Sequence, residues 1–462
     1  MKDVKNLKIA YIGGGSRGWA WQLMGDLALE PALCGEVRLY DIDGEAARRN
    51  AVIGERMGQA PEARSSWKYL AADTLKDALT GCDFVVISIL PGTFEEMESD
   101  VHAPEQYGIY QSVGDTTGPG GLLRSLRTAP MFEEIARAVE KYSPGAWVIN
   151  YTNPMAQCVR TMYRTFPGIK AFGCCHEVFG TQELLCEALA AKSGEPVLPR
   201  QALRTTVQGV NHFTWITQAK YRGEDLFPIY KDFALAHRES GFHGDEKRNW
   251  MNSLFACGHR VKFELFLTYG YIAAAGDRHL AEFNPGMRYL KNPDTVREYQ
   301  FSLTPVSYRR EDLKTHLQKA EALYNGTQAA HPEPSGEEGV AMMKALLGLG
   351  DLVTNVNLPN RGQISNLPMG TVVETNARFS GDSVEPLQTG EMPQAPLTLS
   401  MPAVTAQEMI DEAVARRSVR YAFPAFWNDP LTCGLSAAQA RCLYMKMLEK
   451  TKGYLSEYEL SF

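Results

Sequence analysis

The sequence predicts an α/β protein in which a doubly wound parallel sheet is followed by a second, mixed α/β domain. From residue 8 to about residue 193, short runs rich in β-branched residues alternate with amphipathic stretches, which is typical of a parallel sheet with helices on both faces. After Pro199 the pattern changes to long strands of alternating polarity. A chain of 462 residues is long enough for more than one domain, and we expect two, at residues 1–198 and 199–462.

Local patterns place the individual elements. Six strands are expected in the first domain, at residues 8–12, 36–40, 67–71, 83–90, 146–151 and 170–173. The best-defined helix follows Gly120, because apolar residues recur at helical spacing from Leu122 to Val139. In the second domain we expect strands at 203–210 and 213–221 and a helical region near 246–267. The composition of residues 331–339 and of the proline-rich stretch 384–402 predicts loops.

The composition excludes several classes of protein. The net charge is −7 and the acidic residues are dispersed, so nothing indicates a nucleic-acid partner. No run of about eighteen apolar residues occurs, so no membrane span is expected. The nine cysteines are irregularly spaced, and Cys174 adjoins Cys175, a pairing that disulfide geometry disfavours. Reduced thiols and an amino terminus without a signal-peptide pattern predict a cytoplasmic protein.

A glycine loop follows the first predicted strand and opens a predicted helix, the context in which a Gly-x-Gly-x-x-Gly pattern indicates dinucleotide binding. Asp41 ends the second strand and Asp43 follows it, where an acid accepts hydrogen bonds from an adenosine ribose and so favours NAD over NADP. Together these features predict a Rossmann-type domain that binds NAD, and the alternative is a glycine turn without a ligand. The residues expected in the loop part of this site are Gly13, Gly14, Gly15, Ser16, Arg17 and Gly18.

Two further loops hold polar residues at places suited to a ligand. Asp115 lies in a glycine-dense loop, residues 114–121, just before the long helix, where capping the helix is an equally good interpretation. Asn153 follows an apolar strand, and the carboxyl ends of such strands face the ligand crevice of doubly wound sheets. We therefore expect Asn153 to lie beside the cofactor and to hold a substrate hydroxyl.

Cys175 and His212 each follow a predicted strand, and a thiolate with an imidazole suits a borderline divalent ion. Local sequence alone favours a buried thiol beside a surface imidazole, since no Cys-x-x-Cys or His-Glu-x-x-His pattern accompanies them. Asp277, Arg278 and His279 stand together behind a run of alanines. They fit either a solvated charge cluster or a site for proton transfer and anion recognition.

These motifs occur in the order found in glycoside hydrolase family four, which the sequence resembles over nearly its whole length. The residues that carry the resemblance are the loop 13–18, Gly114-Asp115-Thr116, Asn153-Pro154, Cys175-His176, Asn211-His212, Gly276-Asp277, the stretch 355–368 and Val372-Val373-Glu374. The resemblance implies an NAD domain and a substrate domain with a divalent ion, usually manganese, on Cys175 and His212. It thereby reverses the preference against a metal.

The resemblance also implies a mechanism without net redox change. In that family the sugar is oxidised transiently at C3 by NAD, a base removes the C2 proton, the glycosidic bond breaks by elimination, water adds, and the hydride returns. Asp277 takes the position of the C2 base, with Tyr269 or Tyr271 as a minor alternative. The leaving-group acid is either His176 or Asp115, and the resemblance does not rank them.

The expected substrate is an α-linked hexuronic acid. Residues 173–180 and 275–283 look closest to the branch that cleaves α-linked galacturonic acid, while α-glucuronide and α-galactoside remain open. Arg278, with His279, is the expected partner of the carboxylate, because arginine pairs with it in a planar, bidentate way. Arg124 and Arg127 are rivals. Asn211, beside His212, is expected to contact the sugar.

Two other classes of protein share part of this pattern. A malate- or lactate-type NAD-dependent dehydrogenase has the same glycine loop and an Asn-Pro after a strand, but the sequence has no Gly-Glu-His-Gly stretch for its catalytic histidine. An NAD-sensing protein without catalysis is disfavoured by the candidate acid, base and metal residues. The family resemblance favours a homodimer or homotetramer.

Overall fold

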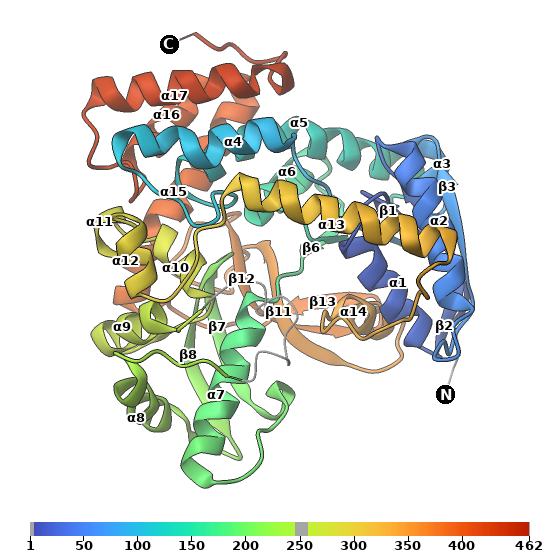
Figure 1. Cartoon of the computed structure of the whole chain (residues 1–462), viewed down its shortest axis with the longest axis horizontal. Helices are drawn as coiled ribbons and strands as arrows, with labels where there is room; N and C mark the ends of the chain where they lie inside the picture. Colours follow the sequence, from blue (N-terminus) through green and yellow to red (C-terminus); the bar gives the residue numbers. More distant parts are fainter. Residues whose placement is uncertain (1–3, 245–256, 462) are drawn as a thin grey trace.

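The computed structural model describes residues 4–244 and 257–461. All six strands predicted in the amino-terminal part are present, and they are parallel. They are β1 (Val4–Ile12), β2 (Leu33–Tyr40), β3 (Trp67–Ala72), β4 (Phe84–Ile87), β5 (Trp147–Asn150) and β6 (Lys170–Gly173). Their spatial order, β3-β2-β1-β4-β5-β6, is that of a dinucleotide-binding doubly wound sheet (Figure 1).

One strand is shorter than the sequence predicts. The strand expected at 83–90 ends at Ile87. Beyond it, the Ser88 N–H still bonds to the Ile12 carbonyl oxygen at 2.9 Å, but the Ile89 N–H turns to the hydroxyl of Thr152, also at 2.9 Å. The side chain of Thr152 therefore replaces the neighbouring strand as hydrogen-bond partner and ends β4.

Helices cover both faces of this sheet, because the strand side chains alternate. In β1, Ile9 and Tyr11 pack with one apolar cluster while Ala10 and Ile12 pack with another on the opposite face. The first cluster includes apolar residues of α1 and α2, and the second those of α3, α6 and the second half of α5. The helices of this part are α1 (Trp19–Leu29), α2 (Gly44–Gly58), α3 (Leu75–Leu79), α4 (Phe94–His102), α5 (Gly118–Tyr142) and α6 (Met155–Thr165).

The predicted helix after Gly120 is α5, and it belongs to two cores. Leu122 and Leu126, in its first half, pack in the largest apolar cluster of the molecule with residues of the carboxyl-terminal part. Phe132, Ile135 and Val139, in its second half, pack under the parallel sheet. A single rod of helix thus joins the two parts of the chain.

Three antiparallel strands extend the parallel sheet: β11 (Leu352–Pro359), β12 (Val372–Ser380) and β13 (Ser383–Pro386). β11 joins the edge of β6, where Asn357 pairs with Gly173. The complete nine-stranded order is β13-β12-β11-β6-β5-β4-β1-β2-β3. The sheet therefore contains strands from both sides of the domain boundary predicted between residues 198 and 199. The boundary stays a prediction.

A smaller antiparallel sheet lies in the second part of the chain. It consists of β7 (Arg204–Val210), β8 (Phe213–Tyr221), β9 (Glu224–Asp225) and β10 (Ile272–Ala273), so the strands predicted at 203–210 and 213–221 are confirmed. On one face Val207 and Ile216 pack against α7 (Glu177–Ser193), α8 (Phe227–His237) and α9 (Arg260–Tyr269). α9 is the described part of the helical region predicted near 246–267, and residues 246–256 lie outside the described residues.

The loop predicted at 384–402 is confirmed at residues 387–393 and wrong at both of its ends. Its first residues belong to β13, and its last belong to α15 (Gln394–Arg416), a helix that continues through Pro402. A proline inside a helix removes one backbone hydrogen bond, but α15 buries Val404, Ile410 and Val414 in the largest core. Burial of this apolar face outweighs the local preference of proline. The loop predicted at 331–339 is confirmed up to residue 338.

The remaining helices complete the shell around the two sheets. α13 passes along the molecule and packs against α2 and α4 (Figure 1). None of the described helices has both the length and the apolar content that a membrane crossing requires. These helices are α10 (Asp277–Glu282), α11 (Gly286–Tyr289), α12 (Pro293–Glu298), α13 (Val306–Asn325), α14 (Gly339–Leu346), α16 (Phe423–Asn428) and α17 (Ala437–Thr451), with short 3-10 turns η1 (Ala103–Tyr107), η2 (Arg200–Ala202), η4 (Val419–Ala422) and η5 (Lys452–Tyr454).

Candidate active site

The glycine loop lies between β1 and α1 and leaves the start of the helix open. Gly13 has φ +93°, and a Cβ there would lie 1.9 Å from the Ser88 carbonyl oxygen, so only glycine fits. Gly18 precedes α1 without any side-chain cap, and a Cβ there would meet nothing within 4 Å. Free N–H groups at an open helix start suit the pyrophosphate of a dinucleotide. The geometry of this loop therefore fits NAD.

Asp41 organises the same loop from the end of β2. Its carboxylate accepts hydrogen bonds from the N–H of Gly15 at 2.8 Å and of Asp43 at 2.9 Å. The Asp43 carboxylate caps α2 by accepting from Ala46 N–H at 3.1 Å, and it pairs with Arg17 at 3.3 Å. Asp41 is thus the acid beside the loop, while Asp43 is engaged in helix capping.

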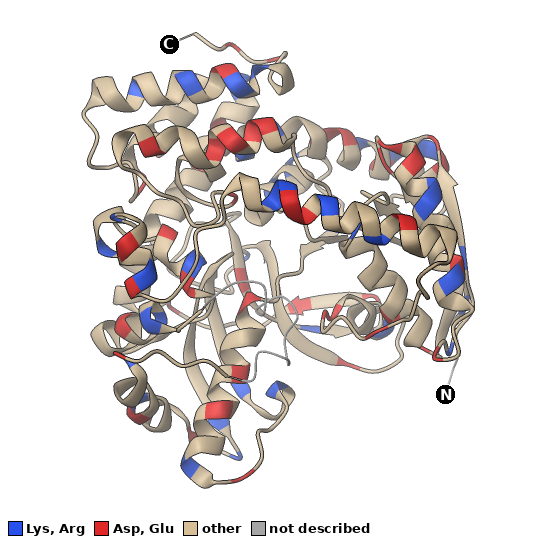
Figure 2. Ribbon diagram, in the orientation of Figure 1, with Lys and Arg blue, Asp and Glu red and all other residues tan. Residues whose placement is uncertain are grey.

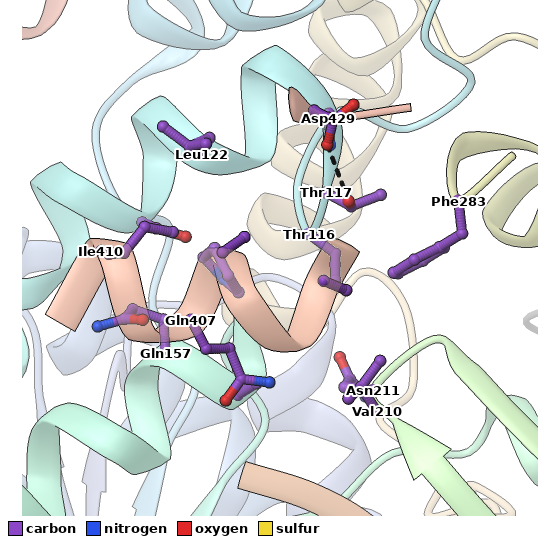
Figure 3. Close-up of a pocket in the computed structure, with 16 residues that line it drawn as sticks. Thr116, Thr117, Leu122, Gln157, Val210, Asn211, Phe283, Gln407, Ile410 and Asp429 are labelled. Atoms are coloured by element: carbon purple, nitrogen blue, oxygen red, sulfur yellow. Dashed lines mark hydrogen bonds between the residues drawn. The ribbon is translucent and has the colours of Figure 1, made fainter. Parts of the chain in front are cut away.

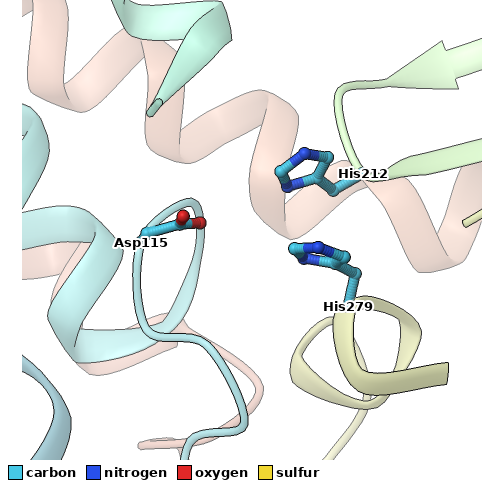
Figure 4. Close-up of side chains that lie close together, drawn as sticks. All are labelled: Asp115, His212 and His279. Carbon is cyan, nitrogen blue, oxygen red and sulfur yellow. The ribbon is translucent and has the colours of Figure 1, made fainter. Parts of the chain in front are cut away.

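Asp115, His212 and His279 come together from three distant segments (Figure 4). One ligand atom of each lies within 4.8 Å of the others, and the two imidazole centroids are 4.0 Å apart. Asp115 stands on the loop before α5, His212 on the turn between β7 and β8, and His279 on α10. A carboxylate and two imidazoles are ligand types that divalent metal ions bind, so these three residues form a candidate metal site.

The protonation of this group suits a metal ion. The Thr116 hydroxyl donates to Asp115 at 2.7 Å and lies 2.9 Å from His212 Nδ1. Because the hydroxyl has one proton, it accepts from His212 Nδ1–H, which leaves the Nε2 lone pair available. Burial and the adjacent His279 lower the pKa of His212 to about 3. Burial would raise the pKa of Asp115, but Arg124 and the two histidines hold it well below its ordinary value.

Cys175 lies next to this group and outside it. Cys175 follows the end of β6 by two residues and is buried, and its backbone carbonyl oxygen accepts from the Asn355 side-chain amide at 3.2 Å. Burial, with Glu374 nearby, raises its pKa well above the ordinary value. Asn211, the neighbour of His212, hydrogen-bonds to the thiol. Among the described residues, His212 therefore groups with Asp115 and His279, and Cys175 is not a member of that group.

Asp277 faces a different set of residues. Its buried carboxylate accepts from the N–H groups of Val261 and Lys262, both at 3.1 Å, at the start of α9. Cys257 and His259 each bring a ligand atom within 4.8 Å of it and of each other. Burial and Cys257 raise the pKa of Asp277 to about 7, so it titrates in the range that a general base needs.

His176 is held by two glutamates. Its Nδ1 lies 3.0 Å from Glu337 and its Nε2 lies 3.8 Å from Glu177, which in turn lies 3.4 Å from His279 Nε2. Burial lowers the pKa of His176, but Glu337 outweighs burial and the net shift is upward. The ionisable side chains of Glu337 and Glu177 therefore connect His176 to His279 of the candidate metal site.

Two asparagines present buried acceptors. Asn153 follows β5 with a cis peptide bond to Pro154, and Asn211 donates to Glu374 at 3.2 Å. The side-chain oxygen of each is buried and has no hydrogen-bond partner among the described residues. Asn211 lines a small cavity of about 50 Å³ between α5, α6 and α15 (Figure 3). Asp429 closes this cavity and caps α5, accepting from Gly118 N–H at 3.0 Å.

The three candidate arginines are engaged to different degrees. Arg127 is fully buried, pairs with both oxygens of Asp100, and donates from Nε to the Pro91 carbonyl oxygen at 2.9 Å. Arg124 donates from Nε to the Asn153 carbonyl oxygen at 3.1 Å. Arg278 lies on α10, between Asp277 and His279. Arg127 is therefore a structural residue, and Arg124 and Arg278 remain near the site.

Comparison with known proteins decides the family. The model "Family 4 glycosyl hydrolase" matches residues 8–191, and the model of its C-terminal domain matches residues 207–432. The chain belongs to family 4 of the glycosyl hydrolases. It is therefore a glycoside hydrolase with an NAD-type sheet, and the resemblance seen in the sequence is confirmed.

Several family 4 proteins are similar to this chain over their whole length. An alpha-galacturonidase of Thermoanaerobacterium saccharolyticum is 56% identical, with 99% of this chain and 98% of that protein covered. An alpha-galacturonidase of Bacillus subtilis is 50% identical, with 97% and 98% covered. The solved structure of a putative glucosidase from Bacillus subtilis has a TM-score of 0.91 at 50% identity, covering 96% of this chain and all of that one.

A more distant solved structure shares the fold. The 6-phospho-beta glucosidase of Thermotoga maritima, solved with manganese, NAD and glucose-6-phosphate, is 22% identical with a TM-score of 0.75, covering 97% of this chain and 99% of that one.

Sequence reasoning missed several acidic residues of the site. Glu177 follows His176 directly, and Glu374 lies in the Val-Val-Glu motif, so each had a local signal. Glu337 lies in the loop before α14, and only the fold brings it to His176. Asn50, on α2, was also missed: its amide donates to the carbonyl oxygens of Gly14 and Ser16, both at 2.8 Å, and fixes the glycine loop.

Proposed function

We propose that this chain cleaves terminal α-linked galacturonic acid, as an α-galacturonidase of family 4, with NAD and a divalent metal ion as cofactors. The observation that carries the proposal is the full-length similarity, at 50% identity or more, to proteins named alpha-galacturonidases. The open glycine loop and the group of Asp115, His212 and His279 support it, since they suit a dinucleotide and a metal.

The residues of the chain fit both cofactors. The loop 13–18 and Asp41 would hold NAD, and His212 with Asp115, His279 and the adjacent Cys175 would hold manganese or a similar ion. When bound, the dinucleotide supplies reversible hydride transfer at C3 and the ion supplies a Lewis acid for substrate oxygens. Asn153 and Asn211 offer buried side-chain acceptors to sugar hydroxyls.

The proton steps are assigned to side chains of the chain itself. Asp277 is our candidate for removing the C2 proton. Because its carboxylate is hydrogen-bonded to the start of α9, either this side chain or the bound sugar must move to bring the two into contact. For the leaving-group proton we favour His176 over Asp115. The Asp115 carboxylate accepts a hydrogen bond from Thr116 and belongs to the candidate metal site. His176 lies outside that site and is oriented by Glu337. Arg278 is our candidate for the uronate carboxylate.

The alternatives within family 4 differ in the sugar. An α-glucuronide differs from an α-galacturonide only at C4, and an α-galactoside only in lacking the carboxylate. Family membership sets the dehydrogenase and the non-catalytic NAD-binding protein aside. An assembly of two or four copies and a cytoplasmic location stay predictions.

The test is a comparison of p-nitrophenyl α-galacturonide, α-glucuronide and α-galactoside with NAD and Mn²⁺, each with and without a chelator. We expect release of p-nitrophenol from the galacturonide, loss of activity with chelator, and no net accumulation of NADH. Faster cleavage of the glucuronide would transfer the proposal to that sugar. Hydrolysis of none of the three would refute it.

A further inference from the structure

Arg309 reaches the site from an element that sequence reasoning did not connect with it. It lies in the first turn of α13. Ser112 connects the residues just before α13 to α10: its carbonyl oxygen accepts from Thr304 N–H at 3.0 Å, and its hydroxyl donates to the Arg278 carbonyl oxygen. Ser112 itself precedes the loop of Asp115. The start of α13, the Asp115 loop and α10 are thus joined at one point.

The side chain of Arg309 points into this junction. Its Nε is buried and has no hydrogen-bond partner among the described residues. Its strongest electrostatic neighbours are Asp115, Arg278 and Asp312, and none of these belongs to the glycine loop. A buried guanidinium N–H without an acceptor is costly, which indicates that a ligand supplies one.

Several arginines gather around Asp115 at the junction. Asp115 interacts electrostatically with Arg124 and with Arg309, and Arg278 is a further electrostatic neighbour of Arg309. Glu282, also near Arg278, has its pKa raised to about 8 by burial, so it adds no negative charge at neutral pH. Basic and acidic residues are otherwise interspersed along α13 and the surrounding ribbon (Figure 2).

We infer that Arg309 is a specificity-determining residue that, together with Arg278, binds the C5 carboxylate of the uronide substrate. The inference rests on the proposed function and deepens it. Two guanidinium groups from separate elements, α10 and α13, would bind one carboxylate, and a neutral galactoside would offer Arg309 no charged acceptor. Charge-assisted and bidentate pairing of this kind discriminates strongly between the two sugars.

The test compares Arg309→Gln and Arg309→Lys with the matched control Arg310→Gln in the NAD- and Mn²⁺-loaded protein. Arg310, the next residue, is half-buried and pairs with Glu95 at 2.8 Å. We expect Arg309→Gln to raise KM for p-nitrophenyl α-galacturonide roughly 10- to 100-fold with a smaller change in kcat. Arg309→Lys should fall between the parent and Arg309→Gln, and Arg310→Gln should match the parent.

Two further measurements separate carboxylate recognition from other roles. Free galacturonate should inhibit the parent much better than galactose, and Arg309→Gln should abolish that preference, while the Kd for NAD stays unchanged by calorimetry. An unchanged KM and unchanged inhibition, or an equal loss of NAD affinity, would overturn the inference. Failure of the parent itself to cleave the galacturonide would instead refute the proposed function. Melting temperatures equal to the parent's establish that the variants fold.

Discussion

Glu282 shows how a single buried carboxyl group ties stability to pH. It accepts from the N–H groups of Val113 and Gly114 at 2.8 and 2.9 Å, and burial raises its pKa from 4.5 to about 8. Since the pKa is higher in the folded than in the unfolded state, its contribution to the free energy of unfolding is fully present below about pH 4.5. That contribution is lost as the pH rises through about 8.

Glu282→Gln keeps an acceptor for both N–H groups and cannot ionise. We expect the melting temperature of the variant to be no higher than the parent's near pH 5 and to exceed it near pH 8, by circular dichroism at both pH values. The exposed Glu385→Gln serves as control and should follow the parent throughout. Parallel curves for Glu282→Gln and parent would contradict the assignment.

The metal site gives a second prediction at the scale of residues. His212→Ala and His279→Ala should each weaken Mn²⁺ binding roughly 10-fold or more, because each removes one nitrogen donor from the group with Asp115. Electron paramagnetic resonance of free Mn²⁺ measures this directly. His331→Ala, at an exposed histidine beside Glu62, should bind as the parent does. If Cys175→Ser lost Mn²⁺ binding while His212→Ala and His279→Ala bound Mn²⁺ as the parent does, the ion would be bound at the thiol instead.

Sequence reasoning identified most of these side chains but not their grouping. Asp115, His212 and His279 stand in recognisable motifs, because each ends a strand or opens a helix at the ligand edge. Which of them face one another depends on side-chain direction, and the structure turns Asp277 away toward α9 although it lies two residues from His279. Arg309 and Glu337 have no local pattern at all, and only the tertiary fold brings them to the site.

At the scale of elements, the predictable parts are those with strong periodicity. The strands of the first sheet and the apolar stripe of α5 agree with the sequence prediction, whereas residues 394–402 of α15 do not, because proline is a strong local signal for a loop. The pairing of β11 with β6 had no sequence signal, since it rests on the meeting of Asn357 and Gly173. Local preference predicts an element, and burial decides whether that preference holds.

Pro402 provides the test of that balance. Pro402→Ala restores a backbone N–H in the interior of α15 and should raise the free energy of unfolding by roughly 1–2 kcal/mol, after allowing for the greater freedom of the unfolded chain. Urea denaturation of variant and parent measures the difference. Pro396→Ala, near the helix start where proline is tolerated, should not stabilise. A less stable Pro402→Ala would show that the proline packs productively in the core.

At the scale of the whole molecule, the two parts of the chain share both a sheet and a helix. β11, β12 and β13 complete the sheet begun by β1, and α5 packs in two apolar clusters, one in the carboxyl-terminal part and one under the parallel sheet. We expect differential scanning calorimetry to show one cooperative transition, with the van't Hoff and calorimetric enthalpies in agreement. NAD should move this transition upward as a unit. Two resolved transitions, only one of them sensitive to NAD, would contradict this coupling.

The packing of α5 in two apolar clusters also affects how the two parts of the chain can move during a reaction. Its first turn adjoins the loop of Asp115, and its second half lies under the sheet that carries the glycine loop. Because α5 packs in both parts of the chain, we expect the loop of Asp115 and the sheet that carries the glycine loop to move together, without the hinge closure seen in many two-domain enzymes. We therefore expect a sugar to gain access by rearrangement of the surrounding loops.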